Sequence, residues 1–277
     1  MQQDGVLSGL GLLYVEKPTY YTPNVACSYS GGTYLTGGTI DPSKAGCFGS
    51  GDVTVSDSAQ FRFYSTAKME NTWRFVNQSG QADAWHNVHF WSSTTVNNVL
   101  GERVAFDLSP NQTLTVNGDV QVGKLILSMS GADHKVDNTA VDMTRFVFNK
   151  PVVTASLNPS LDGRTDGWAL NRFTIVLKAA NNAITNVYLQ SAALNAGVKN
   201  AFGAVTVIHP GVQQTDGDIV DLCGFDQTID RIVLNDKYPI DAQHPAGHIV
   251  TSSKGPAALT LAATVDCETD ALFSGDL

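Results

Sequence analysis

Apolar and polar residues alternate with a period of two in many short runs of this chain, and this pattern predicts strands. Turn residues separate the runs at the spacing of about 8–12 residues that is typical of sandwiches and barrels. The predicted strands cover residues 52–56, 60–64, 72–76, 87–91, 103–108, 113–116, 120–122, 124–128, 145–148, 172–177, 183–189, 204–208, 229–234 and 258–262. Only residues 191–201, rich in Ala and Leu, favour a helix. The pattern therefore predicts an all-β fold of the antiparallel β-sandwich or jelly-roll type, with few short helices.

Turn dipeptides give an expected domain organisation. Asn117-Gly118 indicates a tight turn between two strands, and Asn181-Asn182 indicates a hairpin. Turn signals gather between residues 151 and 167, which predicts a boundary there. We expect two β domains: residues 1–157, with an extended N-terminal strand, and the acidic part at residues 165–277. A single large sandwich is the first alternative. A β-solenoid is the second, although no fixed period supports it.

Charge is sparse and unevenly placed. Charged residues make up 16% of the chain and hydrophobic residues 43%, so uncharged polar side chains cover much of the surface. Residues 1–209 contain 15 acidic and 14 basic side chains, whereas residues 210–277 contain 11 acidic and 3 basic ones, which together give the net charge of −9. This balance argues against nucleic acid as a partner. No run reaches the roughly 20 apolar residues of a membrane span.

Four cysteines form one pair near each end of the sequence. Their spacing matches no zinc motif. Disulfides Cys27–Cys47 and Cys223–Cys267 are the expected connectivity, because each would close a loop-rich segment in an oxidising environment. Four buried free thiols in a reducing compartment are the alternative.

An aromatic strand at residues 85–91 is the candidate ligand-binding site. Alternation places Trp85, Asn87, His89 and Trp91 on one side of the strand, where two rings and two polar groups could hold a glycan. The alternative is that one side of the strand is core and the other an assembly interface, since aromatic residues are enriched in both.

Closely spaced aspartates form the candidate metal site. Asp216, Asp218 and Asp221 supply the carboxylate oxygens that Ca²⁺ prefers, although their spacing does not match an EF-hand. An exposed acidic loop is the alternative. Calcium is the one cofactor that the sequence suggests.

The predicted function depends partly on which catalytic motifs the sequence lacks. It has no nucleophile elbow, zinc-protease motif or phosphate-binding loop. We expect a non-enzymatic structural protein, extracellular or at a virion surface, which self-assembles or packs against other subunits in a virion shell or tail or in an extracellular filament. A secreted carbohydrate-binding or adhesive module is the alternative, and an enzyme acting on polysaccharide is the third hypothesis.

Overall fold

The described strands of this protein pair only in parallel. The computed structural model describes residues 1–56, 59–63, 68–76, 86–90, 94–109, 111–129, 144–158, 173–189, 192–209, 219–233 and 250–263. Among these residues there is no helix, and every strand pairing is parallel. A parallel pair cannot be joined by a tight turn, so the chain travels around and returns beside its own earlier strand. The result is a stack of coils, a parallel β-solenoid.

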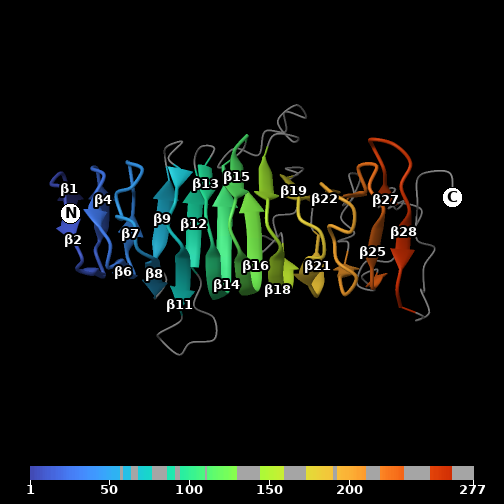
Figure 1. Cartoon of the computed structure of the whole chain (residues 1–277), viewed down its shortest axis with the longest axis horizontal. Coiled ribbons are helices and arrows are strands. Elements are labelled where there is room, and N and C mark those ends of the chain that lie inside the picture. Colours follow the sequence, from blue (N-terminus) through green and yellow to red (C-terminus); the bar gives the residue numbers. More distant parts are fainter. Residues whose placement is uncertain are drawn as a thin grey trace, which may run out of the picture.

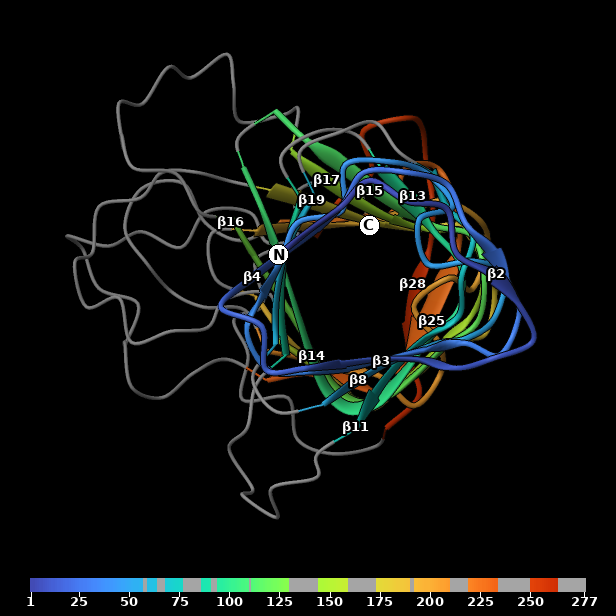
Figure 2. The ribbon, with the colours of Figure 1, turned by 90° about the vertical axis from the view of Figure 1, so that its left-hand side faces the viewer.

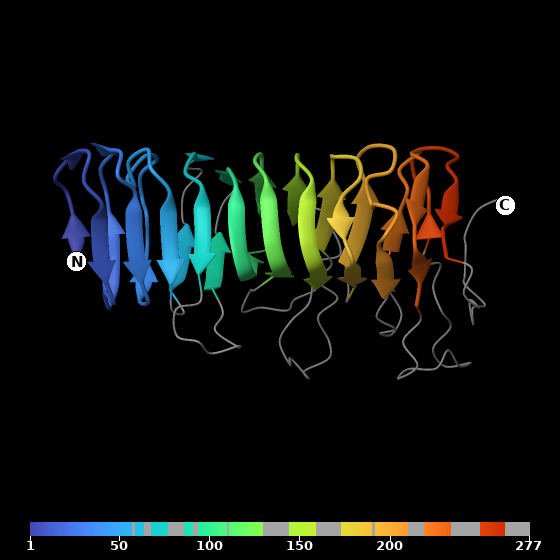
Figure 3. The ribbon, with the colours of Figure 1, turned by 60° about the horizontal axis from the view of Figure 1, so that its bottom comes forward.

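The coils follow one another in chain order along one long axis (Figure 1, Figure 3). Strand β1 (Gln2–Gln3) lies at one end of the stack and β28 (Leu259–Leu261) at the other. In the view along this axis, β3, β8 and β11 share one side of the coil, and β13, β15, β17 and β19 share another (Figure 2). The stack therefore has flat sides that extend along its axis, and we call them faces.

Three faces surround the interior. Face 1 contains β3 (Leu13–Glu16), β6 (Thr33–Thr36), β8 (Val53–Ser56), β11 (Trp73–Val76), the first parts of β14 (Val99–Leu108), β16 (Val120–Met129) and β18 (Val152–Asn158), and β20 (Ala183–Ile184). Face 2 contains β1, β4 (Tyr20–Pro23), β7 (Thr39–Ile40), β9 (Gln60–Phe63), β12 (His86–Phe90), the last parts of β14, β16 and β18, β21 (Asn186–Tyr188), β23 (Val207–His209) and β26 (Arg231–Ile232). Face 3 contains β10 (Lys68–Met69), β13 (Thr94–Val96), β15 (Thr113–Val116), β17 (Arg145–Phe148), β19 (Phe173–Leu177), β22 (Ala192–Ala196), β24 (Ile219–Asp221) and β27 (Val250–Thr251).

Faces 1 and 2 form one 16-stranded sheet because β14, β16 and β18 run through the corner between them, and face 3 is an 8-stranded sheet. Two short pairs complete the described strands: β2 (Ser8–Gly9) with β5 (Ser28–Tyr29), and β25 (Gln227–Ile229) with β28.

Inward-facing side chains of successive coils stack in rows. On face 1, Val15, Leu35, Val55 and Phe75 occupy equivalent positions on four neighbouring strands, and all are buried. Each such side chain contributes about 1.5–3 kcal/mol when it leaves water. Because every coil adds to the same rows, one continuous core extends along the stack.

The all-β prediction is confirmed, but the predicted antiparallel sandwich or jelly roll is wrong. Alternation shows only that one side of a strand is buried, and it does not encode the direction of the neighbouring strand. The predicted short helix is also wrong. Residues 192–196 form β22, in which Ala192, Leu194 and Ala196 are buried on one side.

The coil length varies, which hides the repeat from a search for a fixed period. Partner positions are 20 residues apart in the first coils, as in Leu13↔Thr33, but 32 apart at Thr113↔Arg145. The predicted tight turns are corners between faces: Asn117-Gly118 joins β15 to β16, and Asn181-Asn182 lies between β19 and β20, strands that belong to different sheets.

The boundary predicted between residues 157 and 165 lies between β18 and β19. Backbone pairing continues on both sides of it, because β18 pairs with β16 and β20, and β19 pairs with β17 and β22. Residues 1–157 and 165–277 therefore contribute strands to the same two sheets. In the described residues, no helix has the length and apolar character needed to cross a membrane.

Candidate functional site

The first coil, residues 1–20, exposes a concentration of large apolar side chains. Leu10 is 88% exposed, Leu12 60% and Tyr14 55%. The exposed large apolar residues of this coil are Met1, Val6, Leu7, Leu10, Leu12, Tyr14 and Tyr20. In the rest of the described chain, this class contains Val153, Tyr188, Val205 and Phe225. Terminal repeats of solenoids usually carry a polar outer side, and the first coil combines polar residues with seven exposed large apolar ones.

Strand β3 of the first coil is an open sheet edge. It pairs with β6, where the Leu13 N–H donates to Gly32 O at 3.0 Å, and no other described strand pairs with it. Alternate residues of a parallel strand bond to opposite neighbours, so the backbone groups of Tyr14 and Glu16 point away from β6. Such an edge can pair with another chain. The N-terminal strand expected from the sequence is thus part of the chain's own sheet.

The backbone fixes this edge firmly to the second coil. Gly38 has a φ of 77°, and a Cβ at this position would lie 1.8 Å from the carbonyl oxygen of Pro18. Only glycine allows two coils to approach so closely. The first coil is therefore a well-positioned surface, since its corner is held by backbone contact.

An aromatic stack ends at the open edge. Tyr14 of β3 and Tyr34 of β6 are stacked with ring centroids 5.1 Å apart and planes 5° from parallel. Tyr34 lies one coil further inside the solenoid, so Tyr14 is the outermost ring of the stack on face 1. A further ring placed against this edge would extend a stack that already exists.

Polar groups hydrogen-bond to one another at the end of the core, beside the exposed apolar side chains of the first coil, which we call the apolar rim. The Tyr21 hydroxyl donates to Gln3 Oε1, and Gln3 Nε2 donates to Cys27 Sγ at 3.2 Å. The Leu7 N–H lies 3.4 Å from the same sulfur. Burial raises the pKa of the Tyr21 hydroxyl, so this group remains a hydrogen-bond donor. The amide of Gln3 thus satisfies the polar atoms at the end of the core, while the rim around it is apolar.

The predicted Cys27–Cys47 disulfide is not present. Cys27, Cys47 and Cys223 are free thiols, and Cys267 lies outside the described residues. The Cys27 N–H donates to Gly46 O at 3.0 Å, which places Cys27 beside Cys47 on the next coil. Burial, and then the nearness of Cys27, raises the pKa of the Cys47 thiol to about 12. The spacing of 20 residues between Cys27 and Cys47 thus equals the length of one coil in this part of the chain.

A chain of polar side chains crosses the outer side of face 2. Arg62 donates to Gln60 Oε1 at 3.4 Å, Gln60 Nε2 lies 3.0 Å from His89 Nε2, and His89 Nδ1 lies 3.2 Å from Asp107 Oδ2. Donation from Gln60 leaves His89 Nε2 as the acceptor and Nδ1 as the protonated nitrogen that faces the carboxylate. The side chains come from β9, β12 and β14, three successive coils.

Two residues of the predicted glycan site lie on this outer side. Asn87 is exposed and His89 half-buried, while Val88 between them is buried in the core. Trp85 and Trp91 lie outside the described residues. Sequence reasoning found His89, but it missed Gln60 and Asp107, because register across coils of different lengths brings them together.

The one described residue of the predicted calcium site is already hydrogen-bonded. Asp221 Oδ1 accepts from the backbone N–H groups of Cys223 at 2.8 Å and Ser253 at 2.9 Å. Burial acts to raise the pKa of Asp221, but the hydrogen bonds from Ser253 and Cys223 outweigh it and lower the pKa. Asp216 and Asp218 lie outside the described residues. The described residues contain no group of three His, Cys, Asp or Glu side chains placed to hold a metal.

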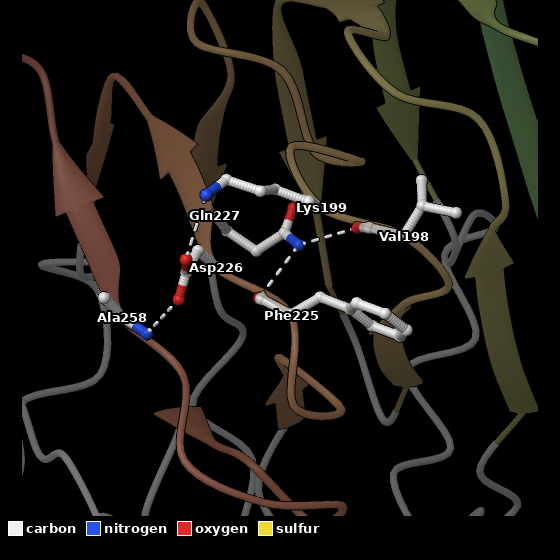
Figure 4. Close-up of polar contacts among 6 residues, drawn as sticks. All are labelled: Val198, Lys199, Phe225, Asp226, Gln227 and Ala258. Atoms are coloured by element: carbon white, nitrogen blue, oxygen red, sulfur yellow. Dashed lines mark hydrogen bonds and ion pairs between the residues drawn. The ribbon is translucent and has the colours of Figure 1, made fainter.

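The last described coils are joined by polar side chains (Figure 4). Gln227, which is 1% exposed, donates from Nε2 to Val198 O at 2.9 Å and Phe225 O at 3.0 Å. Asp226 accepts from Lys199 Nζ at 3.1 Å and from the Ala258 N–H at 3.0 Å. These contacts link three successive coils, so the side chains of Asp226 and Gln227 are hydrogen-bonded to neighbouring coils of the same chain.

Comparisons with known proteins give no relative. No family model matches the sequence, no curated protein matches it, and no solved structure matches the fold at a significant level.

Proposed function

We propose that this protein is a non-enzymatic structural subunit that packs into a larger assembly through its first coil. The assembly is a virion shell or tail, or an extracellular filament. The observation that carries the proposal is the open edge of β3 surrounded by exposed apolar side chains. Exposed apolar side chains gain free energy when a neighbouring subunit covers them, and the open backbone groups of β3 can pair with a strand of that subunit.

The concentration of exposed apolar side chains supports this proposal. The first coil contains seven of the eleven exposed large apolar residues of the described chain. Single exposed apolar residues are normal on a protein surface, whereas a group of them marks an interaction site. The composition of the first coil therefore favours contact with another subunit.

Mass photometry of matched variants tests the proposal. Leu12 is 60% exposed in the first coil, and Val205 is 57% exposed near the other end of the stack. We expect the wild-type chain to form particles heavier than 29.5 kDa. Leu12→Asp should weaken this association at least tenfold, because a charge is placed in the contact, whereas Val205→Asp should leave it unchanged. A wild-type chain that is monomeric at every concentration, or equal association of both variants, contradicts the proposal.

Glycan binding on face 2 is a second candidate function. It is supported by the outward position of Asn87 beside the chain formed by Gln60, His89 and Asp107. Amide and imidazole groups on a flat face can hydrogen-bond sugar hydroxyls. A glycan array probed with the wild type and with Asn87→Ala tests this function: glycan binding that is lost in the variant favours it, and the absence of any bound glycan contradicts it. Activity on polysaccharide stays a hypothesis from the sequence.

A further inference from the structure

We propose that the partner on the first coil is a second copy of this chain, bound head to head about a two-fold axis. This inference rests on the proposed assembly function and specifies the partner. The two first coils face each other, and the β3 strands lie antiparallel at the contact. The assembly unit is then a closed dimer with one solenoid pointing away on each side.

The composition of the surface fits a dimer. Seven of the eleven exposed large apolar residues of the described chain lie in the first coil, so a second first coil offers an equally apolar partner. In an isologous contact the same surface serves both subunits, so the apolar rim of one copy covers the rim of the other. A partner with a smaller apolar surface would leave part of the rim in water.

The far end of the stack is a poorer partner for this rim. The described residues 250–263 contain no exposed large apolar side chain, and Ser253 and Lys254 are exposed there. A head-to-tail contact would therefore cover Ser253 and Lys254 with an apolar rim that offers them few partners, and this costs free energy.

The charges of the first coil allow it to contact itself. Residues 1–20 contain Asp4, Glu16 and Lys17, so their side chains sum to a charge of −1 and two copies repel little.

The backbone and the tyrosine stack give the contact its geometry. The groups of Tyr14 and Glu16 that point away from β6 can pair with the same groups of a second β3 strand running in the opposite direction. The outer ring of each copy, Tyr14, then lies on the same side of the joined sheet as the ring of the other. The stack of Tyr14 on Tyr34 continues across the contact.

Cysteine cross-linking of the full chain distinguishes this arrangement from the alternatives. Leu12→Cys places a thiol on the rim, and Val205→Cys places an equally exposed thiol far from it. With a short bis-maleimide we expect Leu12→Cys to give covalent homodimers at a yield at least tenfold above that of Val205→Cys. The wild type supplies the background from Cys27, Cys47, Cys223 and Cys267. Circular dichroism of each variant checks that it is folded.

The outcomes separate this inference from the proposed function. The head-to-head contact is supported if the particles stay dimers at high concentration, with no larger oligomers, and if Leu12→Cys is cross-linked selectively. Oligomers that grow with concentration and leave Leu12→Cys uncross-linked indicate a head-to-tail contact, which overturns the inference while the proposed assembly function stands. A wild-type chain that is monomeric throughout overturns both.

Discussion

The two ends of the described solenoid use the same coil geometry and differ in what they leave exposed. At the first coil, apolar side chains surround an open strand edge. Strands β27 and β28 of the last described coil are also edge strands among the described residues, but this coil exposes no large apolar side chain. An apolar rim gains free energy when another molecule covers it, whereas an edge with polar surroundings can face water.

This difference shows that assembly can be encoded by the end of a repeat structure. Each coil of a solenoid contacts only its neighbours, so the stability of the stack is roughly a sum of coil and interface contributions. Among the described residues the first coil contacts one neighbouring coil, and its exposed apolar side chains gain free energy when a partner covers them.

The largest expected effect comes from two matched glycines. A Cβ at Gly38 would lie 1.8 Å from Pro18 O, and one at Gly203 would lie 1.9 Å from Asn182 O; both glycines have a positive φ. Each Gly→Ala variant should lose at least about 3 kcal/mol of local stability, because the clash is with backbone. Gly38→Ala should free mainly the first coil, whereas Gly203→Ala should destabilise the stack on both sides.

Hydrogen exchange followed by mass spectrometry, together with urea unfolding, distinguishes the two variants. Gly38→Ala should speed exchange in residues 1–36 and lower the urea midpoint less than Gly203→Ala does. An equal loss of protection along the whole chain in both variants would show that the first coil is not a separate end unit.

A smaller effect is expected from two buried amides. Gln227→Ala removes the partners of Val198 O and Phe225 O and also of the Phe202 N–H, which donates to Oε1 at 3.1 Å, so we expect a loss of about 3 kcal/mol. Gln3→Ala at the first coil should cost about 1 kcal/mol, because Gln3 is only half-buried. Urea denaturation measures both. A Gln3 variant as damaging as the Gln227 variant would contradict the proposed contrast between the ends.

Much of the strand content could be predicted from the sequence, and the reason is local. Residues 113–116 and 145–148 are strands as expected, because alternation records which side of a strand faces the core. The parallel pairing could not be predicted, because offsets of 20 and 32 residues occur in the same stack. Strand β18 lies in a region whose turn residues indicated a domain boundary, and β22 is built from residues with high helix propensity.

The candidate surface was only partly visible in the sequence. An extended N-terminal strand was expected from the sequence, and the structure places β3 near the N-terminus. That this strand is an edge follows from the coil path, which local patterns do not contain. The outer chain of Gln60, His89 and Asp107 depends on register across coils in the same way.

The smallest expected effect is a dependence of stability on pH at face 2. Burial, and then the charge of Arg231, lowers the pKa of His209, which stacks on Tyr188 with ring centroids 4.4 Å apart. The unfolded chain then binds more protons than the folded one below the ordinary value of 6.5, so stability falls as pH drops from 6.5 through the folded pKa. His209→Gln should reduce this fall in urea midpoints measured between about pH 7.5 and about pH 5. An unchanged slope would contradict the assignment.

Hydrogen exchange of β3 as a function of protein concentration tests the central claim most directly. We predict that peptides containing Tyr14 and Glu16 exchange more slowly as concentration rises, because a second copy covers the edge, while peptides containing Val205 keep the same rate. Exchange in β3 that stays constant over a concentration range of about a thousandfold would show that no copy of the chain binds the first coil.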